Sequence, residues 1–193
     1  MHSMKTSAIL AAAIGLLNGS SPQPNRSAVA LTSLRSECTL TEEHRLHWSR
    51  LWLECRGTQA VPVEGFPSLE GRVNIKSSRQ ALEFLRLFSS RSACDRQTST
   101  DWVDVQKARQ DGWLDLNQKE FSRLCPVPGA EEMRVKGEPM AFNAERCLLS
   151  LSSGDLYRVR QRVEQNGHVS SIEETLALKN ASQRLGRCEP GIR

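Results

Sequence analysis

Three runs of alternating or largely apolar positions follow one another in the C-terminal third of the chain. They cover residues 141–151, 156–164 and roughly 169–178. Ser152-Ser153-Gly154 separates the first two runs, and Asn166-Gly167 separates the last two. Gly and Asn accept a positive φ at low steric cost, and Asn-Gly between strand-like runs is a strong hairpin signal. The pattern therefore predicts a three-stranded antiparallel meander over about 142–178.

The length of the first hairpin loop predicts the register of this meander. A three-residue loop places Leu149 opposite Tyr157 and Cys147 opposite Val159, with all four side chains on one face. A two-residue loop would move apolar side chains to the solvent-exposed face of the sheet, so we prefer the three-residue loop. In the second hairpin, a two-residue Asn-Gly turn puts Glu173 opposite an arginine of the middle strand. The wet face of that strand carries the arginine row Arg158, Arg160 and Arg162.

Apolar positions at helical spacing predict three helices before the meander. The clearest is a central helix over about 79–89, which follows a serine cap and has a broad apolar stripe that suits packing across a sheet. A helix is also expected over 117–124, because Asn117 and Glu120 make an N-terminal signature. A first helix is expected within 31–55, where Thr41 is a good N-cap. Its predicted stripe comprises His44, Trp48, Leu51, Trp52 and Cys55.

Alternation over residues 72–76 and 102–106 predicts two further short strands. These strands, the meander and the helices together predict an α+β fold. We expect one antiparallel sheet of four to six strands, with the central helix packed on one face.

The first residues have the features of a secretory signal peptide. Lys5 supplies a short positive region, and residues 8–17 form an apolar core too short to span a bilayer. Small residues at Gly19-Ser20-Ser21 and at Ala28-Val29-Ala30 offer two cleavage sites, so cleavage is expected within 19–30. The alternative is an uncleaved N-terminal anchor or a buried helix. The expected organisation is a leader over 1–30 and one α+β domain over 31–193, with no transmembrane segment in the mature chain.

If the protein is exported, its six cysteines are expected to form disulfides. They are Cys38, Cys55, Cys94, Cys125, Cys147 and Cys188. In an oxidising compartment this even count predicts up to three disulfides, although six cysteines allow 15 pairings. Pairing of sequence neighbours is the working hypothesis: Cys38 with Cys55, Cys94 with Cys125, and Cys147 with Cys188. Because no C-x-x-C motif is present, we expect no metal site and no thioredoxin-like chemistry.

The net charge of +4 is modest and does not favour nucleic acid. The arginine row is the candidate binding surface, with an anionic polymer or an envelope protein as its partner. No aromatic residue is interleaved with these arginines, so a platform for stacking bases is not expected. The alternative is an ordinary solvated sheet face, whose arginines are offset by neighbouring glutamates.

Candidate catalytic groups are few, and no standard catalytic motif is present. Beyond the leader the histidines are His44, His47 and His168. A shared metal on His44 and His47 lacks a third ligand nearby. The carboxylate pairs that would suit glycoside chemistry are Asp101 with Asp104 and Asp111 with Asp115. We therefore identify no catalytic residue and expect no cofactor.

These observations favour a secreted or periplasmic, non-enzymatic domain that binds a protein or polymer partner in the envelope. The first alternative is a small secreted hydrolase that uses carboxylates or His168. The second alternative is a structural envelope protein without a soluble ligand.

Overall fold

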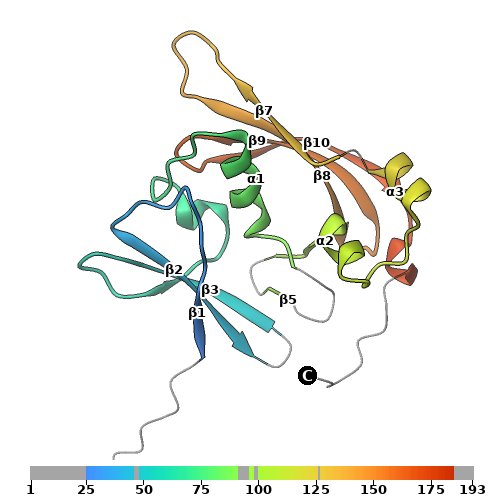
Figure 1. Ribbon diagram of the computed structural model, residues 1–193, viewed down its shortest axis with the longest axis horizontal. Coiled ribbons are helices and arrows are strands. Elements are labelled where there is room, and N and C mark those ends of the chain that lie inside the picture. Colours follow the sequence, from blue (N-terminus) through green and yellow to red (C-terminus); the bar gives the residue numbers. More distant parts are fainter. Residues whose placement is uncertain (1–24, 46–47, 91–95, 98–99, 126, 185–193) are drawn as a thin grey trace, which may run out of the picture.

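The computed structural model describes residues 25–45, 48–90, 96–97, 100–125 and 127–184. Two mainly antiparallel sheets, one from each half of the chain, are accompanied by a few short helices (Figure 1). The sequence predicted a single sheet, so the mixed character of the fold is confirmed whereas the number of sheets was wrong. The expected leader core lies outside the described residues.

The N-terminal sheet has the strand order β1-β2-β3-β4, and β5 pairs with β3 in parallel. Its strands are β1 (Arg26–Ala28), β2 (Cys38–Arg45), β3 (Trp48–Cys55), β4 (Val61–Pro62) and β5 (Arg96–Gln97). The helix predicted within 31–55 was therefore wrong, because this segment forms the β2–β3 hairpin. In β3, Ser49, Leu51, Leu53 and Cys55 are buried in alternation, which is the period of a half-buried strand.

The C-terminal sheet has the strand order β10-β9-β8-β6, and β7 also pairs with β8. Its strands are β6 (Trp102–Asp104), β7 (Gly129–Met133), β8 (Ala141–Ser150), β9 (Leu156–Glu164) and β10 (Val169–Leu178). The antiparallel β8–β9–β10 path confirms the predicted meander. Glu173 lies opposite Arg160 as predicted, but not for the predicted reason. Glu164 and His168 bond across a three-residue loop rather than a two-residue one, and a bulge between Ser171 and Glu173 shifts the register back by one residue.

The register of the first hairpin differs from the prediction by one residue. Leu149 pairs with Leu156 rather than Tyr157, and Cys147 pairs with Arg158 rather than Val159. The reason is the loop, since Ser150 and Asp155 bond across four intervening residues instead of three. Leu149 and Cys147 consequently lie on the face opposite Tyr157 and Val159. Both faces of the β8–β9 pair are partly buried.

The β8–β9 pair has an inner face and an outer face. The inner face carries Phe142, Ala144, Arg146 and Leu148 with Tyr157, Val159, Gln161 and Val163. The outer face carries Asn143, Glu145, Cys147 and Leu149 with Leu156, Arg158, Arg160 and Arg162. Each face therefore presents both apolar and charged side chains, which a single alternating pattern does not reveal.

The predicted central helix is α1 (Ser78–Arg86), which lies against β8. Ser77 caps it by accepting a hydrogen bond from the Gln80 N–H at 3.3 Å. Phe84 and Leu85 are fully buried in a core that also contains inner-face residues and β2–β3 residues. Helix α1 thus packs between the two sheets, a position that a one-sheet prediction could not give.

The tip of the β9–β10 hairpin is packed against the N-terminal half of the chain. Gly71 N–H donates to Asn166 O at 2.7 Å, and Ile75 N–H donates to Gln165 O at 2.8 Å. Gly167 has φ +91°, and a Cβ there would come within 2.5 Å of Val73. The turn therefore needs glycine both for its backbone angle and for this close approach.

A second core lies on the outer face under α2 (Val105–Gln110) and α3 (Gln118–Leu124). Asn117 caps α3 as predicted, accepting from the Glu120 N–H at 3.0 Å. The strand predicted over 102–106 ends at Asp104, because Asp104 caps α2. The strand predicted over 72–76 is reduced to a bridge between Val73 and Leu34. Two 3-10 turns, η1 (Phe66–Leu69) and η2 (Ala181–Arg184), complete the described elements.

Two disulfides occur among the described residues. Cys38–Cys55 joins residues directly opposite one another in the β2–β3 ladder, as predicted. Cys125–Cys147 joins the end of α3 to β8, so the predicted partners of Cys125 and Cys147 were wrong. Pairing of sequence neighbours failed here because Cys147 lies on the outer face, which α3 covers. Cys94 and Cys188 lie outside the described residues.

Candidate functional site

A cleft of about 440 Å³ lies between the N-terminal sheet, the end of α1 and helix α2. Its apolar lining is Val29, Ala30, Leu51 and Leu87. Its charged lining is Glu42, Glu83, Arg86, Asp104 and Lys107, and it also contains serine and glutamine side chains. Ligand pockets usually have volumes of about 300–1,000 Å³ and combine apolar walls with a few polar groups. The cleft has the size and lining of a binding site.

The acidic residues of the cleft hold neighbouring elements in place. Glu83 accepts hydrogen bonds from the Thr32 N–H at 3.2 Å and the Thr32 Oγ1 at 2.6 Å. Asp104 accepts from the Lys107 N–H at 3.0 Å and pairs with Arg86 at 3.9 Å. Carboxylates with such structural partners suit a shaped, polar binding surface better than a general acid or base.

The three arginines predicted to bind a partner lie on the outer face, each with contacts of its own. Arg158 donates to the carbonyl oxygens of Arg123 and Leu124, both at 2.7 Å, at the end of α3. Arg160 pairs with Glu173 at 2.6 Å. Side chains of this row therefore serve the sheet and α3, while Arg160 stays half exposed.

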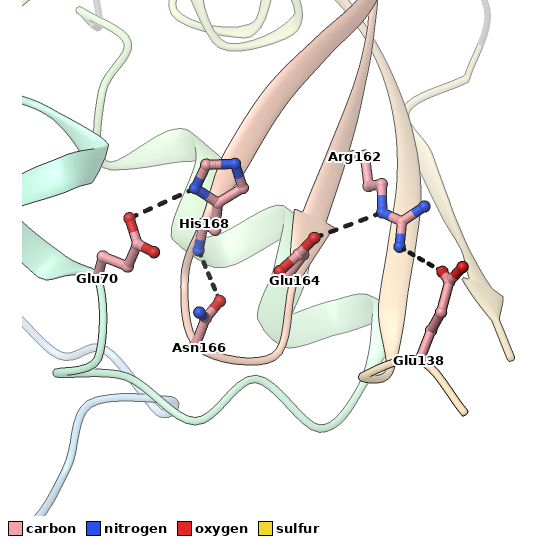
Figure 2. Close-up of polar contacts among 6 residues, drawn as sticks. All are labelled: Glu70, Glu138, Arg162, Glu164, Asn166 and His168. Atoms are coloured by element: carbon pink, nitrogen blue, oxygen red, sulfur yellow. Dashed lines mark hydrogen bonds and ion pairs between the residues drawn. The ribbon is translucent and has the colours of Figure 1, made fainter. Parts of the chain in front are cut away.

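Figure 2 shows the third arginine of the row between two glutamates. Arg162 Nη2 lies 3.1 Å from Glu138 and its Nε lies 3.7 Å from Glu164. Both pairs lie near the surface, where an ion pair typically contributes about 0–1 kcal/mol. An anionic partner would have to displace these glutamates.

His168 also lies in the view of Figure 2, at the tip of the β9–β10 hairpin. Its Nδ1 lies 3.4 Å from Glu70, and its backbone N–H donates to Asn166 at 3.0 Å. His44 pairs with Glu42 at 3.3 Å, and His47 lies outside the described residues. Neither described histidine is hydrogen-bonded to a serine, threonine or cysteine side chain in the described part of the chain.

The aspartates proposed as carboxylate pairs are engaged separately. Asp101 accepts hydrogen bonds from Ser150 Oγ at 2.8 Å and Ser152 Oγ at 2.6 Å. Asp104 caps α2, and Asp111 pairs with Lys107 at 3.0 Å within the same helix region. Asp115 lies between α2 and α3, where its backbone N–H donates to Arg184 O at 3.0 Å. These contacts fasten loops and helix ends.

Arg146, which the sequence did not single out, is the most unusual charged residue of the described structure. It lies on the inner face and is only 3% exposed. Its Nη1 donates to Leu85 O at 2.9 Å and Ser89 Oγ at 3.1 Å, and its Nη2 donates to Gln161 Oε1 at 3.0 Å. Burial lowers the pKa of Arg146 to about 10, so the guanidinium stays charged at neutral pH.

A signal for Arg146 existed in the sequence, although it pointed to the wrong face. In Glu145-Arg146-Cys147-Leu148-Leu149 the arginine precedes an apolar run, and only the register decides which face it takes. Among the described residues, no group of three or more His, Cys, Asp or Glu side chains could hold a metal ion. None of the described helices is long and apolar enough to cross a bilayer.

Comparison with known proteins gives a distant similarity. The chain is 31% identical to CMRF35-like molecule 9 of Homo sapiens over 99 residues, which cover 48% of this chain and 29% of the human protein. No family model matches the chain. No solved structure matches it either. The similarity spans less than a third of the human protein. The two disulfides and this distant similarity together support a disulfide-bonded domain of the extracellular type.

Proposed function

We propose that this protein is an exported, non-enzymatic binding module. The observation that carries the proposal is the cleft of about 440 Å³ between the N-terminal sheet and α1 and α2. Its carboxylates are engaged in hydrogen bonds and ion pairs, and its walls combine apolar and polar groups. Such a lining suits a segment of a protein or polymer partner in the envelope.

Export itself is part of the proposal, and the fold suggests where the leader would end. Arg26 belongs to β1, where it pairs with Glu43 in the ladder, and its guanidinium lies 4.1 Å from the centre of the Trp52 ring. Cleavage after Ala30 would remove this strand from the N-terminal sheet. We therefore favour cleavage near Gly19-Ser20-Ser21, which keeps β1 in the mature protein.

Intact mass of the protein recovered from an exporting host tests this part of the proposal. The expected chain starts between residues 20 and 25, and its mass rises on reduction by at least the four hydrogens of the two described disulfides. A chain that starts at Leu31, or a full-length chain with free thiols, would contradict the proposal.

A cleft-blocking variant tests the binding function. Gln110 is exposed on α2 and lines the cleft, so Gln110→Trp should fill the space without disturbing the interior. Gln59→Trp is the matched control, because Gln59 is exposed and lies away from the cleft lining. Retention of the oxidised protein on isolated envelope fractions should fall at least fivefold for Gln110→Trp alone. Equal retention of both variants and the unmodified protein would reject the cleft as the site.

The outer-face arginine row remains a second candidate surface for the same binding function. Arg160 is an accessible member of the row, with a side chain 50% exposed beside Glu173 at 54%. If an anionic polymer binds there, Arg160→Ser should lower retention on immobilised polyanion, and added salt should lower it further. Retention that is insensitive to Arg160→Ser would remove this surface.

The hydrolase alternative makes a different prediction. If His168 acted on a substrate, His168→Ala would abolish activity towards ester, glycoside or peptide substrates. We expect the unmodified protein and His168→Ala to show the same background rate. Substrate turnover that depends on His168 would replace the binding proposal by the enzymatic one.

A further inference from the structure

A second, smaller pocket of about 160 Å³ lies on the inner face of the C-terminal sheet. It shares no lining residue with the cleft described above. Three aromatic side chains form part of its wall, namely Phe66, Phe88 and Trp102. Arg146 and Gln161 also line it, and the exposed Glu174 of β10 stands among its lining residues.

The guanidinium of Arg146, which lines this pocket, has donors without an acceptor among the described residues. Arginine carries five N–H groups. Three of those of Arg146 donate to Leu85 O, Ser89 Oγ and Gln161 Oε1. Its Nε is buried and has no hydrogen-bond partner among the described residues. One N–H on Nη2 is also left over, and Nε and Nη2 form the edge of the guanidinium that can grip a carboxylate with two parallel bonds.

The charges around Arg146 come from three elements. Asp104, at the end of β6, attracts the guanidinium but is itself paired with Arg86 of α1. On β10, Glu174 is aligned with Arg146 through Val159, which is the ladder partner of both. No carboxylate of the described residues lies in hydrogen-bonding or ion-pair contact with Arg146. Buried charges are normally paired, so Arg146 is unusual as a buried cation without a bonded anion among the described residues.

We propose that this pocket binds a small monocarboxylate, gripped by Nε and Nη2 of Arg146. The apolar part of the ligand lies against Phe66, Phe88 and Trp102. Glu174 repels a second negative charge, so dicarboxylates are disfavoured. The carboxylate belongs either to a free small molecule or to the C-terminus of a peptide, and the two sources offer the same group to Arg146.

Nuclear magnetic resonance of the oxidised full chain tests the proposal through the Arg146 Nε–H signal. Propionate is the probe and propionamide is its neutral match, both titrated at constant ionic strength. Propionate should shift the signal in a saturable way, whereas propionamide should leave it in place. An acetylated dipeptide with a free or an amidated C-terminus then distinguishes a peptide end from a free small molecule.

Glu174→Gln sharpens the test without touching the buried guanidinium. Glu174→Gln removes the repulsion between the Glu174 carboxylate and the carboxylate of propionate. Propionate should therefore bind about threefold to tenfold more tightly to this variant. Glu173→Gln is the matched control, because Glu173 pairs with Arg160 on the outer face and should leave the affinity unchanged. Arg146→Lys keeps the charge but loses the two-bonded grip, and should weaken binding at least tenfold.

Several outcomes would overturn the proposal. Equal shifts with propionate and propionamide would show that no charge is recognised. The absence of a saturable shift would mean that only water occupies the pocket. If Arg146→Lys fails to fold, the Glu174→Gln and Glu173→Gln pair still decides, and equal affinities for these two variants would reject the assignment to Arg146.

Discussion

The two faces of the β8–β9 pair carry arginines in opposite situations. On the outer face, Arg160 is half exposed and pairs with a glutamate that is also half exposed. On the inner face, Arg146 is 3% exposed and donates to Leu85 O, Ser89 Oγ and Gln161 Oε1. Arg160 thus pairs with an opposite charge at the solvent-exposed surface, whereas Arg146 donates to neutral acceptors in the protein interior.

The burial of an arginine therefore affects the stability of this sheet more than the number of arginines in a row does. An exposed ion pair contributes little because water and salt screen it. A buried guanidinium contributes more, because removing it leaves its buried acceptors without a donor. Each such acceptor then lowers the free energy of unfolding by its full desolvation cost. We therefore expect Arg146 to contribute more to the free energy of unfolding than any arginine of the outer-face row.

The largest expected effect comes from the disulfide of the outer face. Replacing Cys125 and Cys147 by serine removes a cross-link between residues 22 apart, which the loop-entropy model values at about 3 kcal/mol of unfolding free energy. Urea denaturation of the oxidised proteins measures this loss. A loss below about 1 kcal/mol would mean that the Arg158 hydrogen bonds and the apolar packing, rather than the disulfide, hold α3 on this face.

Arg146→Met comes next. The substitution keeps an apolar stem but leaves Leu85 O, Ser89 Oγ and Gln161 Oε1 without their donor, and should lower the unfolding free energy by about 2–3 kcal/mol. The same urea series reports it. A stable Arg146→Met protein would show that the inner face needs no charge, as buried charges replaced by apolar residues sometimes prove dispensable.

Gly167→Ala tests the packing at the end of the inner face, with Gly137→Ala as its control. Both glycines have a positive φ, +91° and +89°, so the backbone strain of alanine is common to both. A Cβ at 167 would meet Val73 at 2.5 Å, whereas nothing lies within 4 Å at 137. Thermal unfolding should show an additional loss of about 2 kcal/mol at 167. Equal losses would show that the hairpin tip moves away freely.

Arg158→Met should have an intermediate effect on the outer face. Arg158 donates to the carbonyl oxygens of Arg123 and Leu124, which lie at the C-terminal end of α3. Losing these bonds should cost about 1 kcal/mol, because water reaches the freed carbonyl groups. Hydrogen exchange of the α3 amides should quicken more than that of β10. Uniform exchange across both elements would argue against a local role in α3.

Arg160→Met should have the smallest effect, below about 0.5 kcal/mol, since its partner Glu173 is exposed. It serves as the matched control for Arg146→Met, with the same substitution on the other face of the same strand pair. Measurement in 0.5 M NaCl should leave the Arg160→Met difference near zero. A loss as large as that of Arg146→Met would remove the distinction between the faces.

Several elements were predictable because their signals are local. The Asn166-Gly167 signal is local and correctly located the second hairpin. Its loop nevertheless has three residues rather than the predicted two, and Glu173 lies opposite Arg160 only because a bulge between Ser171 and Glu173 shifts the register back. Ser77 and Asn117 cap helices through bonds that span only three residues. The alternating runs of the meander likewise needed no knowledge of distant segments.

Other elements depended on contacts between distant parts of the chain. The segment from Cys38 to Cys55 fits a helical stripe, but its period-two burial only appears once α1 and the second sheet supply a core. The four-residue loop after Ser150 moved the register by one position and sent Arg146 to the inner face. The expected pairing of Cys147 rested on order in the sequence, whereas its partner Cys125 is brought to it by the packing of α3 on the outer face.

The meander and the capped helices α1 and α3 follow from the amino-acid sequence alone, because each rests on residues that are neighbours in the chain. The two sheets, the Cys125–Cys147 disulfide and the burial of Arg146 follow only from the packing of distant segments. These outcomes depend on which face of a strand is covered by elements remote in sequence. A one-residue change in a loop reverses that choice for every side chain along the strand.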